Sequence, residues 1–173
     1  MPKNNLNTIV MIAAFAIHVL IGGEPKPNGQ GNVEEIARNL YENYYDFYWK
    51  EIPGLSDYVT SDFYVSLLTE IKCKEVCAIE AVPWLDAQEG EVSEPIGFKL
   101  EAETELESSV IMSYVFYLSE TQKKPQTVHF IFFREAGDKP WKLSDFITPG
   151  GNSLRKQIDN WHKEYGDIAE YDE

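Results

Sequence analysis

A chain of 173 residues with 43% hydrophobic and 25% charged residues has the size and composition of one globular domain with a substantial core. Its 29 acidic residues against 15 basic residues give a formal net charge of −14. This charge repels phosphate backbones and anionic lipid headgroups, so it argues against nucleic-acid binding and favours either simple solubility or a basic protein partner.

The N-terminal residues have the pattern of an export signal. Lys3 precedes an apolar run, Ile9 to Ile21, and small residues follow the run. The run is shorter than the roughly 20 residues that a membrane-spanning helix needs, and it fits the hydrophobic part of a secretory signal. We therefore expect residues 1–23 to be a signal peptide cleaved near Gly23, and residues 24–32 to be a linker.

An uncleaved N-terminal anchor is the alternative for residues 1–23. His18 interrupts the apolar run, and the residues before the expected cut do not follow the Ala-x-Ala pattern. No cysteine stands beside the run, so a lipid anchor is not expected, and any membrane contact would come from this segment. The signal predicts a periplasmic protein. The rest of the chain is expected to form a single domain over residues 33–165, followed by an acidic tail over residues 166–173.

Cys73 and Cys77 are the only cysteines of the chain. Export to an oxidising compartment favours a disulfide between them. If both lie on a helix, their spacing puts them on one face at a Cα separation that a disulfide can bridge. Free thiols are the alternative. The nearest histidine is His129 and no second cysteine pair completes a zinc site, so we expect no metal.

Two helical segments are expected to open the domain. Residues 33–52 carry apolar side chains at helical spacing, Asn32 can cap the start, and Pro53-Gly54 ends the run. Aromatic residues also occupy the other face of this helix, which suggests that a curved sheet embraces it. Residues 55–76 predict one or two short helices.

An irregular segment and four strands are expected next. Residues 78–95 lack a period and contain prolines and a glycine, which is typical of a segment with a functional role. Alternating side chains predict strands over residues 96–107, 109–120, 127–135 and 140–147. The first strand has one apolar face and should be half-buried. The second and third have two apolar faces and should be covered on both sides. A last helix is expected from Ser153 to about Tyr165.

The order of these elements predicts an α+β fold. Short turns force neighbouring strands to be antiparallel. We expect N-terminal helices packed in the concave face of a strongly bent antiparallel sheet, a cystatin-like cone, with the C-terminal helix closing its open mouth or edge.

The chain resembles exported bacterial envelope proteins of the nuclear-transport-factor-two-like superfamily, and more narrowly an uncharacterised family of lipoproteins and periplasmic proteins. The resemblance covers residues 33–160 and rests on three pieces in order: "ARNLYENYYDFY" with "LSDYVTSDFYVSLL", then "WLDAQEG", then "WKLSDFI" leading into "NSLRKQI". It implies the cone fold. It implies little about activity, because this superfamily includes isomerases, dehydratases and non-catalytic proteins, among them immunity proteins that block toxins in the periplasm.

The candidate binding residues come from the irregular segment and from the strands. The irregular segment contributes Trp84, Asp86 and Gln88, which could instead simply bond loop backbone. The first strand contributes an acidic ladder that could meet a basic partner or be a solvated outer face: Glu101, Glu103 and Glu105. His129 alternates with apolar residues on a strand, where a lone histidine is more often structural.

Catalysis would require a base that faces the pocket of the cone and a donor for a developing oxyanion. Asp86, His129 and Asp145 are the candidates for such a base. Asp145 is more simply a residue that ties the last strand to the final helix. No nucleophile elbow, P-loop or metal-binding spacing is present in the sequence, and no cofactor is expected.

Three functions are therefore open. The first is an exported, non-enzymatic binding protein, most concretely an immunity or inhibitor protein against a secreted toxin, which would use the acidic face and residues 78–95. The second is a small-molecule-binding protein or an isomerase- or dehydratase-like enzyme that uses the pocket of the cone. The third is a structural envelope protein. An open cavity reached by Asp86 or His129 would favour the second, and a cone filled by aromatic rings would favour the first or third.

Overall fold

The computed structural model describes residues 32–74, 77–119 and 121–166. The predicted signal peptide lies outside these residues, as do all but the last residue of the linker and all but the first residue of the acidic tail. The elements in chain order are α1 (Val33–Asn43), the 3-10 turn η1 (Leu55–Asp57), α2 (Ser61–Lys72), β1 (Glu91–Glu103), β2 (Glu107–Ser119), β3 (Gln122–Phe133), β4 (Lys142–Ile147) and α3 (Leu154–Tyr165).

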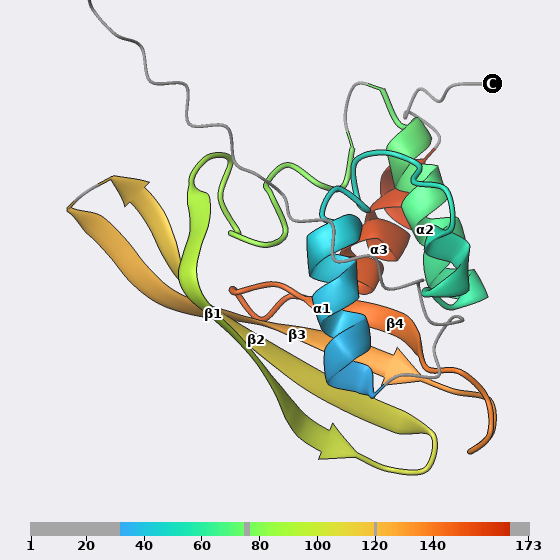
Figure 1. The fold of residues 1–173 in the computed structure, drawn as a ribbon. Coiled ribbons are helices and arrows are strands. Elements are labelled where there is room, and N and C mark those ends of the chain that lie inside the picture. The colour runs from blue at the N-terminus through green and yellow to red at the C-terminus, as the bar shows by residue number, and fades with distance from the viewer. Residues whose placement is uncertain (1–31, 75–76, 120, 167–173) are drawn as a thin grey trace, which may run out of the picture.

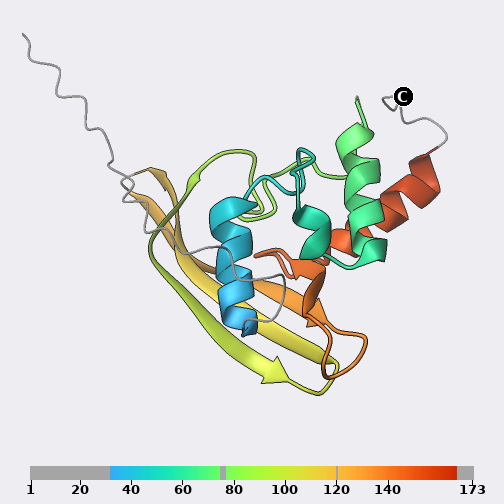
Figure 2. The same ribbon diagram turned by 45° about the vertical axis from the view of Figure 1, so that its right-hand side comes forward.

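The four strands form one antiparallel sheet in the order β1-β2-β3-β4, so the predicted α+β class and the antiparallel meander are confirmed. The sheet is twisted, and α1 lies across one of its faces, in contact with β1 and β2 (Figures 1 and 2). Helices α2 and α3 contact each other and β4, which is the opposite edge strand of the sheet. Only α1 therefore packs on the face of β1 and β2, whereas both N-terminal helical segments were expected there.

Helix α1 starts as the sequence predicts and ends earlier. The Asn32 side-chain oxygen accepts a hydrogen bond from the Glu35 amide at 2.8 Å, which caps the helix. The helix stops at Asn43 rather than at residue 52, and Tyr44 has left helical geometry with φ −128°. Five of residues 44–49 are aromatic, and aromatic side chains lose rotamer freedom in a helix, which disfavours its continuation. The tight turns that replace the helix bury Phe47 and Tyr48 and leave Trp49 exposed.

The sheet begins and pairs differently from the prediction. β1 starts at Glu91 rather than at residue 96, so the irregular segment ends at Gly90 rather than at residue 95. β3 starts at Gln122 rather than at residue 127, because the hairpin with β2 continues to Ser119. Residues 58–60 run beside β4, with the Thr60 amide donating to the Leu143 carbonyl at 2.9 Å. This contact covers the outer edge of β4, while β1 is the edge strand that no further strand of the described residues pairs with.

The two faces of the sheet differ in burial. On the face toward α1, the inward side chains of β2 and β3 are buried, among them Met112, Tyr114 and Phe130. On the opposite face Ile111, Val115 and Ile131 are only half-buried, and no helix of the described residues covers β1, β2 or β3 there. The expectation that both faces of these strands are covered is therefore not met within the described chain.

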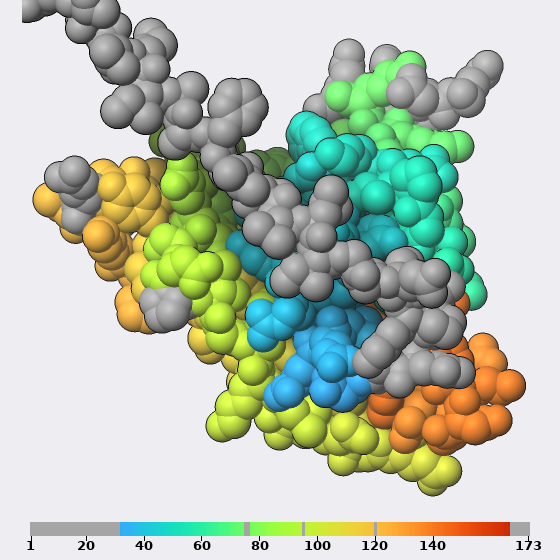
Figure 3. All heavy atoms as spheres, viewed as in Figure 1, coloured from blue at the N-terminus to red at the C-terminus, as the bar shows by residue number. Residues whose placement is uncertain are grey.

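Interlocked aromatic rings fill the space between α1 and the sheet. Trp84 is fully buried at their centre, with its ring centroid 4.8 Å from that of Phe146 and 5.1 Å from that of Tyr45. Edge-on contacts to Tyr41 and Phe47 and a tilted contact to Phe130 complete the shell. The space-filling view shows α1 packed directly against β1 on the face in view (Figure 3). The high aromatic content is therefore used as core filler.

The buried tyrosines predict a loss of stability at alkaline pH. Burial, and then the Asp46 carboxylate, raise the pKa of Tyr48 to about 12, and burial also raises the pKa of Tyr45 and Tyr114. An unfolded tyrosine loses its proton near pH ~10. Between these values the unfolded chain binds fewer protons than the folded chain, so the free energy of unfolding must fall as the pH rises.

We therefore expect urea unfolding to give a free energy of unfolding that falls as the pH rises from about 10 to about 12. Tyrosinate absorbance at high pH should show a group of tyrosines that ionises only as the near-ultraviolet dichroism disappears. Ionisation of all ten tyrosines in one step without loss of that dichroism would contradict the prediction.

Candidate functional site

The predicted site around Trp84 is a tight turn that closes on itself. The Val82 amide donates to the Ala87 carbonyl, and the Asp86 amide donates back to the Val82 carbonyl, each at 2.9 Å. Asp86 has a positive φ of 52°, which aspartate tolerates better than most residues because its short side chain can bond nearby backbone. The turn thus needs this residue type for local geometry, whatever else Asp86 does.

Within this turn the three predicted residues have different exposures. Trp84 is buried, its indole Nε1–H donates to the Tyr45 carbonyl at 2.8 Å, and its own carbonyl accepts from the Tyr114 hydroxyl. Asp86 and Gln88 are exposed. A contact between a partner and this turn would therefore use Asp86 and Gln88, while Trp84 holds the turn from the interior.

The acidic residues of β1 do not form the predicted ladder. The register of β1 against β2 shifts between Leu100 and Ala102, so Glu101 and Glu103 do not lie on the same face of the sheet. Glu101 instead accepts from Ser109 Oγ at 3.1 Å, and its Oε2 lies 3.0 Å from His129 Nδ1 on the sheet face away from α1. An edge strand tolerates such a bulge because only one neighbour constrains its register.

These two groups of predicted residues are far apart. β1 begins just after the Trp84 turn, and Glu101 follows Glu91 by ten strand residues at about 3.3 Å each. Figure 1 shows the turn near the start of β1 and the Glu101 region toward its far end. They therefore cannot act on one small molecule. Asp145 accepts from Ser153 Oγ at 2.5 Å and from the Arg155 amide at 3.1 Å, so it ties β4 to α3 as its structural interpretation predicts.

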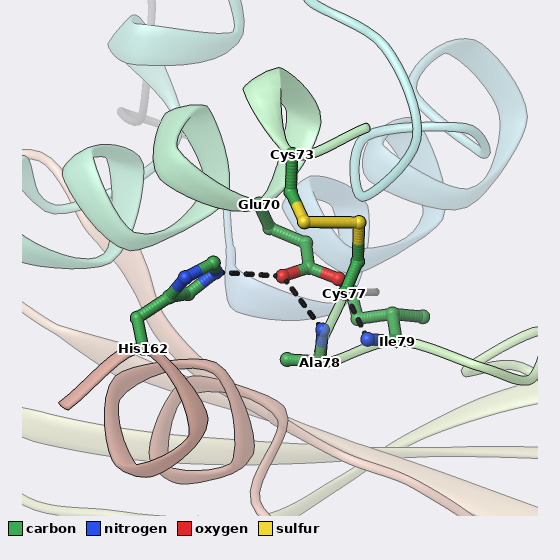
Figure 4. The surroundings of a disulfide bond; sticks show 6 residues. All are labelled: Glu70, Cys73, Cys77, Ala78, Ile79 and His162. Atoms are coloured by element: carbon green, nitrogen blue, oxygen red, sulfur yellow. Dashed lines mark hydrogen bonds and ion pairs between the residues drawn. A yellow bond between two sulfur atoms is a disulfide. The ribbon is translucent and has the colours of Figure 1, made fainter. Parts of the chain in front are cut away.

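A cluster that the sequence analysis missed surrounds the two cysteines. A disulfide joins Cys73 and Cys77, whose Cα atoms are 5.7 Å apart. Cys73 is the cap that ends α2, so the two cysteines do not share a helix as first pictured. Just before it, the buried Glu70 carboxylate accepts from the Ala78 amide at 3.1 Å and from the Ile79 amide at 2.6 Å (Figure 4).

His162 of α3 completes this cluster. Its Nε2 lies 2.8 Å from Glu70 Oε2, and the histidine side chain is 11% exposed (Figure 4). The Glu70 clip, as we call the contacts of Glu70 with Ala78, Ile79 and His162, therefore fastens the start of the irregular segment to α2 and α3. The sequence held one signal of it: Glu70 falls on the same helical stripe as the buried Phe63 and Leu67, where a charge needs a partner.

A surface cavity of about 590 Å³ opens beside this cluster. The disulfide, three charged residues and four large apolar or aromatic side chains line it: Glu70, Lys74 and Glu80, with Tyr48, Trp49, Ile71 and Ile79. Trp49 is 70% exposed, the highest value among the exposed large hydrophobic residues of the described chain. Tryptophan is enriched among the residues that contribute most to binding energy at protein interfaces, so Trp49 is a candidate contact residue.

No group of three or more His, Cys, Asp or Glu side chains in the described residues is arranged to hold a metal ion. Likewise, no helix within the described part of the chain is long and apolar enough to span a membrane. No family model, curated protein or solved structure matches this chain.

Proposed function

We propose that this protein is an exported, non-enzymatic binding protein for a basic protein partner, most concretely an immunity or inhibitor protein against a toxin that acts in the periplasm. The observation that carries the proposal is the packing between α1 and the sheet, where Trp84, Phe130 and Phe146 are fully buried against one another. A carrier or an isomerase-like enzyme with its site in that space would need room for a ligand, and these rings occupy it.

Two features support export. Residues 1–23 have the composition of a secretory signal. The disulfide between Cys73 and Cys77 is of the kind that persists in oxidising compartments and is rare in the cytosol. Both are consistent with a periplasmic protein that folds after translocation.

The open edge of β1 supports a basic partner. Glu91, Glu94, Glu101 and Glu103 are all exposed along this strand, in a chain of net charge −14. Such a field accelerates the encounter with a positively charged protein and suppresses wrong partners. Trp49 and the cavity beside it provide an apolar contact of the type that dominates binding energy.

The finer assignment of the fold belongs to the same proposal. The element order, the antiparallel meander and α1 on one sheet face support a cystatin-like cone of the nuclear-transport-factor-two-like superfamily. An experimental structure tests this: a sheet whose curvature wraps α1 is expected, and a flat layer would remove the assignment.

A capture experiment with charge-neutralised variants tests the function. The full chain carrying a C-terminal tag is expected to be recovered from the periplasmic fraction without residues 1–23 and to retain a stoichiometric, basic protein from envelope extract. Glu101→Gln/Glu103→Gln should weaken that retention at least about tenfold, because interface charges set the encounter and the specificity. The matched control Glu42→Gln/Glu164→Gln changes the net charge equally on two other exposed residues.

Recovery of the tagged chain only from the cytosol would overturn export. Equal retention by the two double variants would overturn the β1 surface, and the absence of any stoichiometric partner would overturn the binding function.

A further inference from the structure

A second cavity, of about 580 Å³, lies away from the Trp84 rings and from the disulfide. It forms where the turn between β3 and β4 meets the first residues of α2 and of α3. Ile131 and Phe133 provide apolar surface, and four cationic side chains from three parts of the chain surround it: Arg134, Lys139, Lys142 and Arg155. We call this the basic cavity.

This concentration of cations is unusual in so acidic a chain. The basic cavity takes four of the 15 lysines and arginines of a protein with net charge −14. Three acidic residues also line it: Asp62, Glu107 and Glu135. The count of four cations against three carboxylates therefore makes its lining positive where the molecule as a whole is negative.

The cations are not explained by ion pairs within the fold. Arg134 lies over the Trp141 ring at 4.0 Å and donates to the Glu105 carbonyl, and Lys142 donates to the Ser56 carbonyl at 3.2 Å. Neither of them, nor Lys139, pairs with a carboxylate of the described residues. Only Arg155 does so, at the long distances of 3.5 Å to Asp62 and 3.6 Å to Asp159.

The start of α2 adds to the positive character of the cavity. Thr60 and Ser61 line it, and the Thr60 side chain makes no capping hydrogen bond, so the first amides of a helix of 12 residues have no side-chain acceptor there. The positive end of the helix dipole favours an anion at this point, partly offset by Asp62 in the first turn. The helix end is an addition to the cationic lining and does not define the site.

We infer that the basic cavity binds a small anion that carries an apolar or aromatic body, such as an aromatic carboxylate or sulfonate. The cations offer charge-assisted hydrogen bonds to the anionic group, and Ile131 and Phe133, the latter 36% exposed, receive the apolar body. This function is independent of the proposed protein partner, because it uses neither Glu101 nor Trp49.

A pair of matched probes tests the inference. The anionic dye 8-anilinonaphthalene-1-sulfonate and its neutral analogue N-phenyl-1-naphthylamine share a ring skeleton and differ in the sulfonate. The purified full chain is expected to bind the anionic dye with one-to-one stoichiometry and more tightly than the neutral one. Lys139→Gln/Lys142→Gln should weaken binding of the anionic dye at least about tenfold, because lost hydrogen bonds between charged groups are worth at least that factor.

The control is Lys123→Gln/Lys124→Gln, which removes the same charge from two exposed residues of β3 at the opposite end of the sheet. It should leave binding of the anionic dye within about twofold, since surface charges away from a site contribute little. Thermal unfolding of each variant, followed by circular dichroism, shows that the fold is retained.

Three results would overturn the inference: no saturable binding of the anionic dye, equal affinity for the neutral analogue, or equal loss in the two double variants. The first would show that the cavity has no affinity for such anions. The second would show that binding is only apolar, and the third that it reflects the net charge of the whole molecule.

Discussion

Replacing Trp84 with alanine is expected to lower the free energy of unfolding by about 4 kcal/mol, as for other fully buried tryptophans. The side chain is 0% exposed and contacts five aromatic rings, and its Nε1–H donates to the Tyr45 carbonyl. The rings around it come from α1, from the turns after it and from the two strands β3 and β4, so they cannot all collapse into the space that the substitution leaves. A loss of this size is a large share of the stability of a domain.

Urea unfolding followed by far-ultraviolet dichroism measures this loss. The matched control is Trp49→Ala, because Trp49 is 70% exposed. That control should stay within about 0.5 kcal/mol of the wild-type protein. Similar losses in the two variants would mean that Trp84 does not hold the interior together.

Replacing Glu70 with alanine is expected to cost about 3 kcal/mol, the second largest effect. Its carboxylate is buried and accepts from the Ala78 and Ile79 amides, with His162 Nε2 at 2.8 Å. The substitution leaves the two amides without their acceptor, and buried amides cost more when unpaired than a surface bond contributes. The irregular segment should then detach from α2 and α3 while the disulfide still holds Cys77 near Cys73.

Two comparisons separate the Glu70 clip from a general charge effect. Glu70→Gln keeps one side-chain acceptor and should cost about half as much, while Glu80→Ala removes an exposed carboxylate and should be close to neutral. Hydrogen exchange should show the Ala78 and Ile79 amides losing protection in Glu70→Ala. Unchanged protection of these amides in Glu70→Ala would contradict the role assigned to the clip.

Trp84 and Trp49 show that tertiary packing decides which tryptophan is buried and which is exposed. Trp84 was expected at a binding site because it stands in the irregular segment together with Asp86 and Gln88. The structure places it at the centre of the core, whereas Trp49, which the periodicity of residues 33–52 assigned to a helix, is 70% exposed. Whether an aromatic residue is buried depends on what packs against it, and a local pattern does not contain that information when the residue lies outside a regular element.

The basic cavity could not have been found from the sequence. Lys139, Lys142 and Arg155 lie on the β3–β4 connection, on β4 and on α3, and each alone has the pattern of an ordinary surface residue. Only the placement of the β3–β4 turn beside the starts of α2 and α3 brings them to one opening. The Glu70 clip is similar, because Glu70 and His162 are separated by 92 positions.

The sequence by itself determined the order and type of the elements, the start of α1 at the Asn32 cap, the antiparallel meander and the proximity of Cys73 to Cys77. Each of these depends on a local repeat, a cap or a short spacing, and local interactions suffice for them. The tertiary structure alone decided where α1 ends, where β1 bulges, which face of the sheet is buried and which charged residues meet. Those outcomes depend on packing between segments that are distant in the sequence, and a local stretch of sequence does not contain that information.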